Sequence, residues 1–146
     1  MLRTIDHINI VVSSLEKTLT FFKTLGFSEG DSGKLEGSWI SDIVGLKNVS
    51  ADYVSLSLPD NLTRIELIQY HTPASERDHN MHLANQLGFR HLAFKVNDID
   101  TVVEKLTSQG VELVGTVQTY PKTGKKLVYF YGPDNILLEL AQYPDK

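Results

Sequence analysis

Two histidines and two glutamates recur at matching positions in this chain of 146 residues, and both residue types can bind metal ions. His7 and His91 lie 84 residues apart, and Glu66 and Glu139 lie 73 residues apart. Imidazole and carboxylate are common ligands of divalent ions, and a buried pair of carboxylates is costly unless a cation lies between them. The four residues therefore predict one divalent-metal site.

The four residues belong to an internal repeat. Residues 7–26 align without a gap with residues 91–110, and residues 65–70 align with 138–143. Each half thus begins with a histidine strand followed by a helix and ends with a glutamate strand. We predict one domain over residues 1–146, made of a module at 1–72, a linker at 73–85 and a module at 86–146. The extra length of the first half, around 28–50, is predicted to be a loop with a short helix at 39–44.

The alternation of side chains along a strand predicts which residues share a face of the sheet. The apolar positions of each strand are expected to pack under the helix of the same half, and the others face the opposite side. The residues expected on that opposite face are His7, Asn9, Val11, Arg64, Glu66, Ile68 and Tyr70 in the first half, and His91, Ala93, Lys95, Leu137, Glu139, Ala141 and Tyr143 in the second.

The two helices carry signals at both ends. Ser13 and Asn97 are predicted to be the N-cap residues, because each is followed three positions later by an acidic residue. Gly26 and Gly110 are predicted to end the helices in the left-handed conformation.

Several stretches together resemble the vicinal oxygen chelate superfamily, which includes glyoxalases, bleomycin-resistance proteins and extradiol dioxygenases. They are residues 6–12, 25–27, 65–67, 89–96 and 132–140. The resemblance covers the whole chain and implies an α+β fold, in which two βαβββ modules form a curved eight-stranded mixed sheet around a metal. It places the family's ligand positions on His7, Glu66, His91 and Glu139.

A His/Glu/His/Glu set looks most like the branch of glyoxalase I and methylmalonyl-CoA epimerase. That likeness implies a metal-dependent lyase or isomerase, with nickel, cobalt, zinc, manganese or iron as cofactor. The metal would chelate adjacent oxygens of a small substrate while a carboxylate moves a proton through an enediolate. Glu139 is the first candidate base and Glu66 the second. Arg90 stands where the epimerases carry a histidine, and Val11 stands where a basic residue would help to bind an anion. We therefore expect a substrate linked to neither glutathione nor coenzyme A. The resemblance also implies a homodimer, because related proteins usually dimerise.

Three alternatives remain open within the same superfamily. An extradiol-type dioxygenase would hold iron with His7, His91 and Glu139, but residues 118–126 lack the histidine expected there. A drug-binding protein of the bleomycin-resistance type needs no metal ligands, yet all four are present. A drug-modifying transferase of the fosfomycin type uses fewer carboxylates.

Other polar and aromatic residues are secondary candidates. Arg64, Lys95, Tyr70 and Tyr143 share the parity of the ligands and could contact substrate. Further aromatic residues that could line the site are Trp39, Tyr53, Tyr129 and Tyr131. The remaining histidines are not predicted to be ligands: His71 has the wrong parity, and His79 and His82 lie in the polar linker.

Composition excludes several other functions. The net charge of −4 and a single basic cluster at 122–126, which we interpret as a turn, argue against nucleic-acid binding. The absence of cysteine excludes disulfides and thiol chemistry. No apolar run approaches the length of about 18 residues that a membrane span needs. With no signal-peptide pattern at the N-terminus, we expect a cytoplasmic protein.

Overall fold

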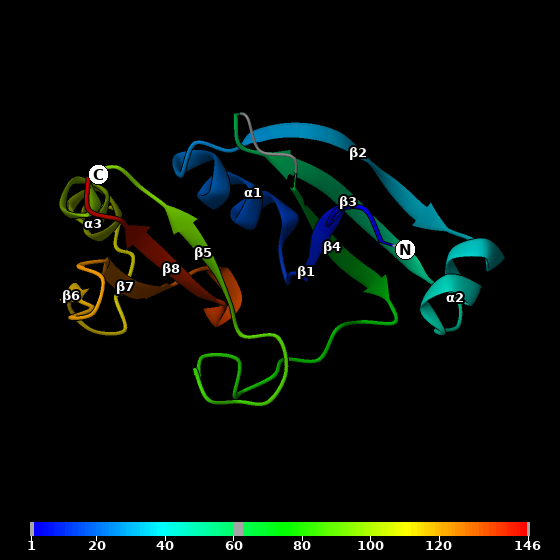
Figure 1. Ribbon diagram of the computed structural model, residues 1–146. Helices are drawn as coiled ribbons and strands as arrows, with labels where there is room; N and C mark the ends of the chain where they lie inside the picture. Colours follow the sequence, from blue (N-terminus) through cyan, green and yellow to red (C-terminus); the bar gives the residue numbers. More distant parts are fainter. Residues whose placement is uncertain (1, 60–62, 146) are drawn as a thin grey trace. The chain divides into compact units, whose positions relative to one another are not determined.

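The computed structural model describes residues 2–59 and 63–145 (Figure 1). The chain divides into two compact units, one ending at Arg77 and the other beginning at Asp78. We call them the first and the second module and describe each by itself.

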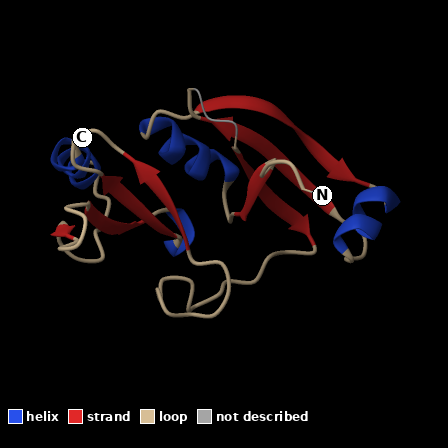
Figure 2. Ribbon diagram, viewed as in Figure 1, coloured by secondary structure: helices blue, strands red, loops and turns tan. Residues whose placement is uncertain are grey.

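The first module contains one four-stranded mixed sheet, with strands and helices distinguished in Figure 2. Its elements are β1 (His7–Val11), α1 (Leu15–Thr24), β2 (Ser28–Glu36), α2 (Ser38–Val44), β3 (Ser50–Ser57) and β4 (Arg64–Thr72). The strand order is β1-β4-β3-β2, with β1 parallel to β4 and the other pairs antiparallel. The first and last strands of the module are therefore neighbours.

Helix α1 covers one face of this sheet, because its apolar side faces the strands. Phe22 of α1 and Leu67 of β4 are completely buried. The ring of Phe22 also meets that of Phe27 edge to face, with centroids 5.3 Å apart. As the alternation predicts, Ile65 and Leu67 belong to this core, whereas Glu66 points to the other face.

Strand β2 corrects the loop predicted at the start of the longer half. Residues 28–36 form an edge strand that pairs only with β3, and a bulge interrupts the pairing between Glu29 and Ser32. Nearly all of its side chains are exposed. An exposed edge strand needs no apolar alternation, which explains why residues 28–36 carry no strand pattern. The short helix expected at 39–44 is present as α2.

The second module repeats the arrangement. Its elements are β5 (His91–Lys95), α3 (Ile99–Ser108), β6 (Gln118–Thr119), β7 (Lys126–Tyr131), the short 3-10 helix η1 (Pro133–Asn135) and β8 (Leu137–Gln142). The strand order is β5-β8-β7-β6, with β5 parallel to β8. Ile99 and Leu106 of α3 are buried, as are Phe130 and Leu138 of the sheet. The predicted α+β fold with a βαβββ module used twice is confirmed, and its eight strands form two four-stranded mixed sheets.

Both N-cap predictions were wrong by one residue. Ser14, not Ser13, caps α1 by accepting a hydrogen bond from the Lys17 amide. Asp98, not Asn97, caps α3, and its carboxylate accepts from two backbone amides, which an ionised acceptor does better than an amide. The predicted ends are confirmed, because Gly26 and Gly110 both have positive φ angles, 97° and 80°. None of the described helices is long and apolar enough to cross a membrane.

Candidate functional site

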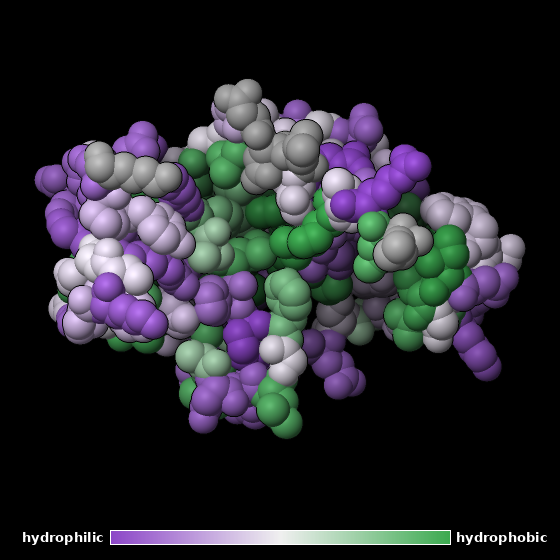
Figure 3. All heavy atoms as spheres, in the orientation of Figure 1, coloured by the Kyte–Doolittle hydropathy of each residue, from purple (hydrophilic) through white to green (hydrophobic). Residues whose placement is uncertain are grey.

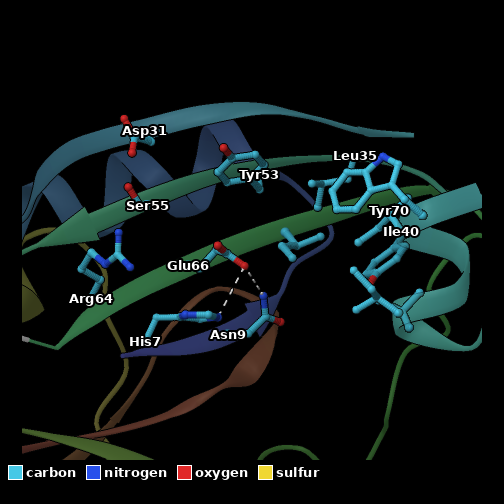
Figure 4. A pocket seen from close by; sticks show the side chains of 14 residues that line it. His7, Asn9, Asp31, Leu35, Ile40, Tyr53, Ser55, Arg64, Glu66 and Tyr70 are labelled. Atoms are coloured by element: carbon cyan, nitrogen blue, oxygen red, sulfur yellow. Dashed lines mark hydrogen bonds and ion pairs between the residues drawn. The ribbon is translucent and has the colours of Figure 1, made fainter. Parts of the chain in front are cut away.

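The parallel pairing of β1 with β4 brings His7 and Glu66 together. Asn9 of β1 lies opposite Glu66 in the register. Nε2 of His7 is 3.9 Å from Oε1 of Glu66, and the amide of Asn9 donates to the same oxygen at 3.2 Å (Figure 4). Two residues that are 59 positions apart in sequence thus form a pair on the face opposite to α1.

The second nitrogen of His7 is held by Asp6. Nδ1 of His7 lies 2.7 Å from Oδ2 of Asp6, and Arg64 donates to the same oxygen at 3.0 Å. The hydrogen bond from His7, followed by the charge of Arg64, lowers the pKa of Asp6, which is therefore ionised at neutral pH. An ionised acceptor at Nδ1 favours the proton on that nitrogen and leaves the Nε2 lone pair directed toward Glu66.

The second module forms the equivalent pair from β5 and β8. Nε2 of His91 lies 3.0 Å from Oε2 of Glu139. Ala93 takes the place that Asn9 has in the first module, since it lies opposite Glu139 in the register. The Glu139 side chain is 6% exposed, compared with 25% for the Glu66 side chain, so the carboxylate of the second module is the more deeply buried of the two.

Two further side chains surround Glu139. Lys125 donates to Oε1 at 3.2 Å, and this hydrogen bond raises the pKa of Lys125. The ring of Tyr129 lies 4.8 Å from the His91 ring. Burial, with the nearby charge of Glu139, raises the pKa of Tyr129, so its hydroxyl keeps its proton at neutral pH. Each oxygen of Glu139 therefore faces a nitrogen, one on His91 and one on Lys125.

The first module contains a cavity of about 530 Å³ on the face that carries His7 and Glu66. Its polar lining includes both residues with Asn9, Ser55 and Arg64 (Figure 4). Six residues that the alternation assigned to one face line it together: His7, Asn9, Arg64, Glu66, Ile68 and Tyr70. The size is typical of small-molecule sites, which measure about 300–1,000 Å³.

The distance between the two ligand atoms of each pair can be compared with the distance expected around one metal ion. Two ligand atoms at about 2.1 Å from a metal, at angles of about 90–110°, are about 3.0–3.4 Å apart. The His91–Glu139 distance of 3.0 Å falls in this range, and the His7–Glu66 distance of 3.9 Å needs a small closure. Over residues 2–59 and 63–145, no three or more His, Asp or Glu side chains form a group that could hold a metal. Each module contains two of the four predicted ligands, and their assignment to one metal centre stays a prediction.

The secondary candidates have different surroundings. Arg64 lines the cavity but is bound to Asp6, and Lys95 lies 5.8 Å from the centre of the Tyr143 ring. Of the aromatic residues, Trp39, Tyr53 and Tyr70 line the cavity. Nε2 of His71 lies 2.8 Å from Oδ2 of Asp52, on the face of β4 opposite to Glu66. His79 and His82 are exposed, as predicted.

The sequence did not point to Asp6 and Lys125, which hydrogen-bond to His7 and Glu139. Asp6 precedes β1 and Lys125 lies in the turn before β7, so neither belongs to a strand whose alternation would assign it a face. An acidic residue next to a predicted metal-binding histidine was the available signal for Asp6. No comparable signal marked Lys125 within its basic cluster.

The fold agrees with comparisons to known proteins. The model of the Glyoxalase/Bleomycin resistance protein/Dioxygenase superfamily matches residues 4–140, and the chain belongs to this superfamily. The uncharacterized protein YwkD of Bacillus subtilis (strain 168) is 34% identical over 145 residues, covering 97% of this chain and 98% of YwkD. A glyoxalase family protein from Bacillus cereus has a crystal structure that superposes with a TM-score of 0.91. It is 34% identical, with 99% of this chain and 97% of that chain covered.

A more distant relative in structure carries a metal. A mutant of the fosfomycin resistance protein FosX from Listeria monocytogenes was crystallised with Mn(II) and 1S,2S-dihydroxypropylphosphonic acid. It is 20% identical, with a TM-score of 0.65, and 96% of this chain and 90% of that chain are covered. At this identity the likeness shows the fold alone. A protein of similar fold has thus been crystallised with a divalent metal and a small molecule.

Proposed function

We propose that this protein is a divalent-metal-dependent lyase or isomerase of the glyoxalase type, with His7, Glu66, His91 and Glu139 as its metal ligands. The observation that carries the proposal is the recurrence of one His–Glu pair, on neighbouring parallel strands, in both modules. A structural histidine or a solvent-facing glutamate has no reason to occur twice at equivalent positions. A shared ion explains the repetition, because four ligands satisfy a divalent metal and two do not.

The chain supplies the groups that such a reaction needs. When bound, the cation acts as a Lewis acid on a carbonyl oxygen and acidifies the adjacent C–H group. Asn9 and Arg64 lie on the lining of the cavity and offer N–H donors to a substrate oxygen. Asp6 fixes the ring of His7 so that Nε2 stays directed at the ion.

Either carboxylate is a candidate to accept the proton, with Glu139 first and Glu66 second. Glu139 is buried, and Lys125 and His91 restrict the positions of its oxygens, which keeps a base aligned with its target. Glu66 lines the cavity, where a substrate can reach it directly. Replacing each in turn by glutamine removes the basic oxygen while nearly preserving the shape of the side chain.

The first test is the metal content of the untagged protein, purified without chelator. We expect about one equivalent of nickel, cobalt, zinc, manganese or iron per pair of modules. His7→Ala and His91→Ala should each lower it strongly. His71→Ala is the matched control, because His71 is also a strand histidine paired with a carboxylate, and it should retain the metal. A protein that takes up no metal, even after reconstitution, contradicts the proposal and favours a non-catalytic small-molecule binder.

The second test follows the chemistry. Hemithioacetals of 2-oxoaldehydes and acyl thioesters are incubated with the metal-loaded protein in deuterated water, and exchange of the C–H next to the carbonyl is followed by NMR. Glu139→Gln should abolish exchange if Glu139 is the base, whereas Glu66→Gln should do so if the order is reversed. Consumption of oxygen by an iron-loaded protein, without exchange, would instead support the dioxygenase alternative.

A homodimer is part of the proposal, and complementation tests how it is built. His7→Ala and His91→Ala chains are prepared separately, mixed after mild unfolding and refolded together. If one site takes its two modules from two chains, half of the sites in a mixed dimer contain both histidines and recover metal. If each site is built within one chain, mixing restores nothing.

A further inference from the structure

The cavity of the first module has two chemically different ends. Around His7 and Glu66 the lining is polar, whereas toward α2 it is formed by aliphatic and aromatic side chains (Figure 4). The residues of this apolar end are Leu35, Trp39, Ile40, Ile43, Val44, Ile68 and Tyr70. A ligand that fills the cavity therefore meets oxygen- and nitrogen-bearing groups at one end and a hydrophobic wall at the other.

Helix α2 exposes unusually large apolar side chains along this wall. Ile43 is 71% exposed and Trp39 is 53% exposed, whereas Ile40, one turn away, is packed in the core. Apolar surface is visible over α2 in the space-filling view (Figure 3). An isolated exposed apolar residue is ordinary, but two on the rim of a cavity with polar ligating groups indicate a surface that a ligand covers.

Helix α2 is also specific to the first module. It follows the edge strand β2 and precedes β3, whereas the connection between β6 and β7 of the second module is a turn. Its inner side is fixed, because Ile40 packs with Val49, Ala51 and Ile68. The first module thus has an apolar wall at one end of its cavity, and the described part of the second module has no helix equivalent to α2.

We infer that the substrate is amphiphilic, with adjacent oxygens at one end and an aryl or branched-alkyl group that packs against Trp39 and Ile43. This inference rests on the proposed function, because it assigns the polar end of the ligand to the metal ligands. The cavity of about 530 Å³ holds a molecule of that kind. The wall formed by α2 is the specificity determinant, since it contacts the part of the substrate that does not react.

The test uses two hydroxamates that share one chelating head. Benzohydroxamate carries a phenyl ring and acetohydroxamate a methyl group, and both present two adjacent oxygens to zinc. Trp39 is the only tryptophan of the chain, so its fluorescence reports occupancy of the wall in zinc-loaded protein. We expect benzohydroxamate to quench it and to bind at least about tenfold more tightly, because its ring leaves water for an apolar surface.

Two variants test whether the preference for the phenyl compound comes from the wall formed by α2. Ile43→Ser should reduce the preference for the phenyl compound to less than about threefold, since it removes an apolar contact and leaves the fluorophore in place. Leu46→Ser is the matched control, because Leu46 is also exposed but lines a different hollow, and it should keep the preference.

The outcomes separate the two proposals. Equal affinity of the two hydroxamates for zinc-loaded protein would overturn the amphiphilic substrate while leaving the metal-dependent function standing. A protein that binds none of nickel, cobalt, zinc, manganese and iron would remove both. Trp39 fluorescence that changes with protein concentration, and not with hydroxamate, would mean that a second copy of the chain covers α2, and would also overturn the inference.

Discussion

The ion pair between Lys125 and Glu139 offers a quantitative test of the site without any substrate. Its N–O distance is 3.2 Å, and the two side chains are 24% and 6% exposed. Lys125→Met keeps the apolar stem of the side chain and removes the ammonium group. Glu139 then keeps His91 as a neighbour on one oxygen and loses the donor on the other.

The expected cost follows from this geometry. At 3.2 Å and an effective dielectric constant of about 20, the attraction is about 5 kcal/mol before desolvation is subtracted. Measured losses of a buried charge-assisted hydrogen bond are smaller, about 1–3 kcal/mol. For a chain of this size that corresponds to a Tm lower by about 3–10 °C. Because the pKa of Lys125 is raised, its ammonium group is charged at pH 7, and the stabilisation from that charge is present below pH 10.5 and lost as the pH rises through the higher, folded-state pKa.

Lys126→Met is the matched control in thermal or urea unfolding followed by circular dichroism. Lys126 pairs with Asp100 at the same distance of 3.2 Å, but those side chains are 42% and 68% exposed. Exposed pairs contribute about 0–1 kcal/mol, so this variant should unfold almost like the wild type. Equal losses in the two variants would refute the reasoning. Zinc should shrink the loss in Lys125→Met, since a bound cation replaces the missing positive charge beside Glu139.

Three further predictions address the core, the carboxylate of Asp6 beside His7, and stability in acid. Leu67 is fully buried in β4, so Leu67→Ala should lower the free energy of unfolding by about 2–5 kcal/mol, measured by urea titration. A smaller loss would mean that the core closes over the gap. Asp6→Asn should weaken zinc affinity by about 10–100-fold in competition with a chromophoric chelator; unchanged affinity would show that His7 needs no orienting carboxylate. The pKa of Asp98 is lowered from 3.8 chiefly by the hydrogen bond from Thr101, so its stabilisation is present above that pH and lost as the pH falls through the lower, folded-state pKa. Asp98→Asn should therefore make the free energy of unfolding depend less on pH below pH 4. An unchanged pH dependence would count against the role of Asp98 as the cap.

The predictable part of the fold is the part governed by period-two alternation. Ile65 and Leu67 had to face a helix, so Glu66 had to face away, and the cavity lining follows that rule along the whole of β4. The glycines after both helices were equally predictable, because Gly26 and Gly110 occupy a backbone conformation that disfavours other residues.

Outside the regular strands, the sequence contains less information about where a side chain points. Lys125 reaches Glu139 from a turn, and the turn geometry is set by Gly124 at a φ of 72° and by the pairing of β6 with β7. The N-caps moved by one residue because Ser13 and Ser14, like Asn97 and Asp98, are neighbours of similar chemistry. Only the angle at which each strand enters its helix decides between them, and that angle is a property of the packed module.

The parallel neighbours β1–β4 and β5–β8 have a kinetic consequence. A His–Glu pair closes a loop of 59 residues in one module and 48 in the other, so it cannot form from local structure. Contacts of such long range are late events in folding, because the entropy of loop closure is lost before they stabilise the chain. A partly folded module can contain its helix and its hairpins while its histidine and its glutamate are still far apart. High-affinity metal binding would then act as a marker of completed folding, and the time course of zinc uptake during refolding would report the docking of the first strand against the last.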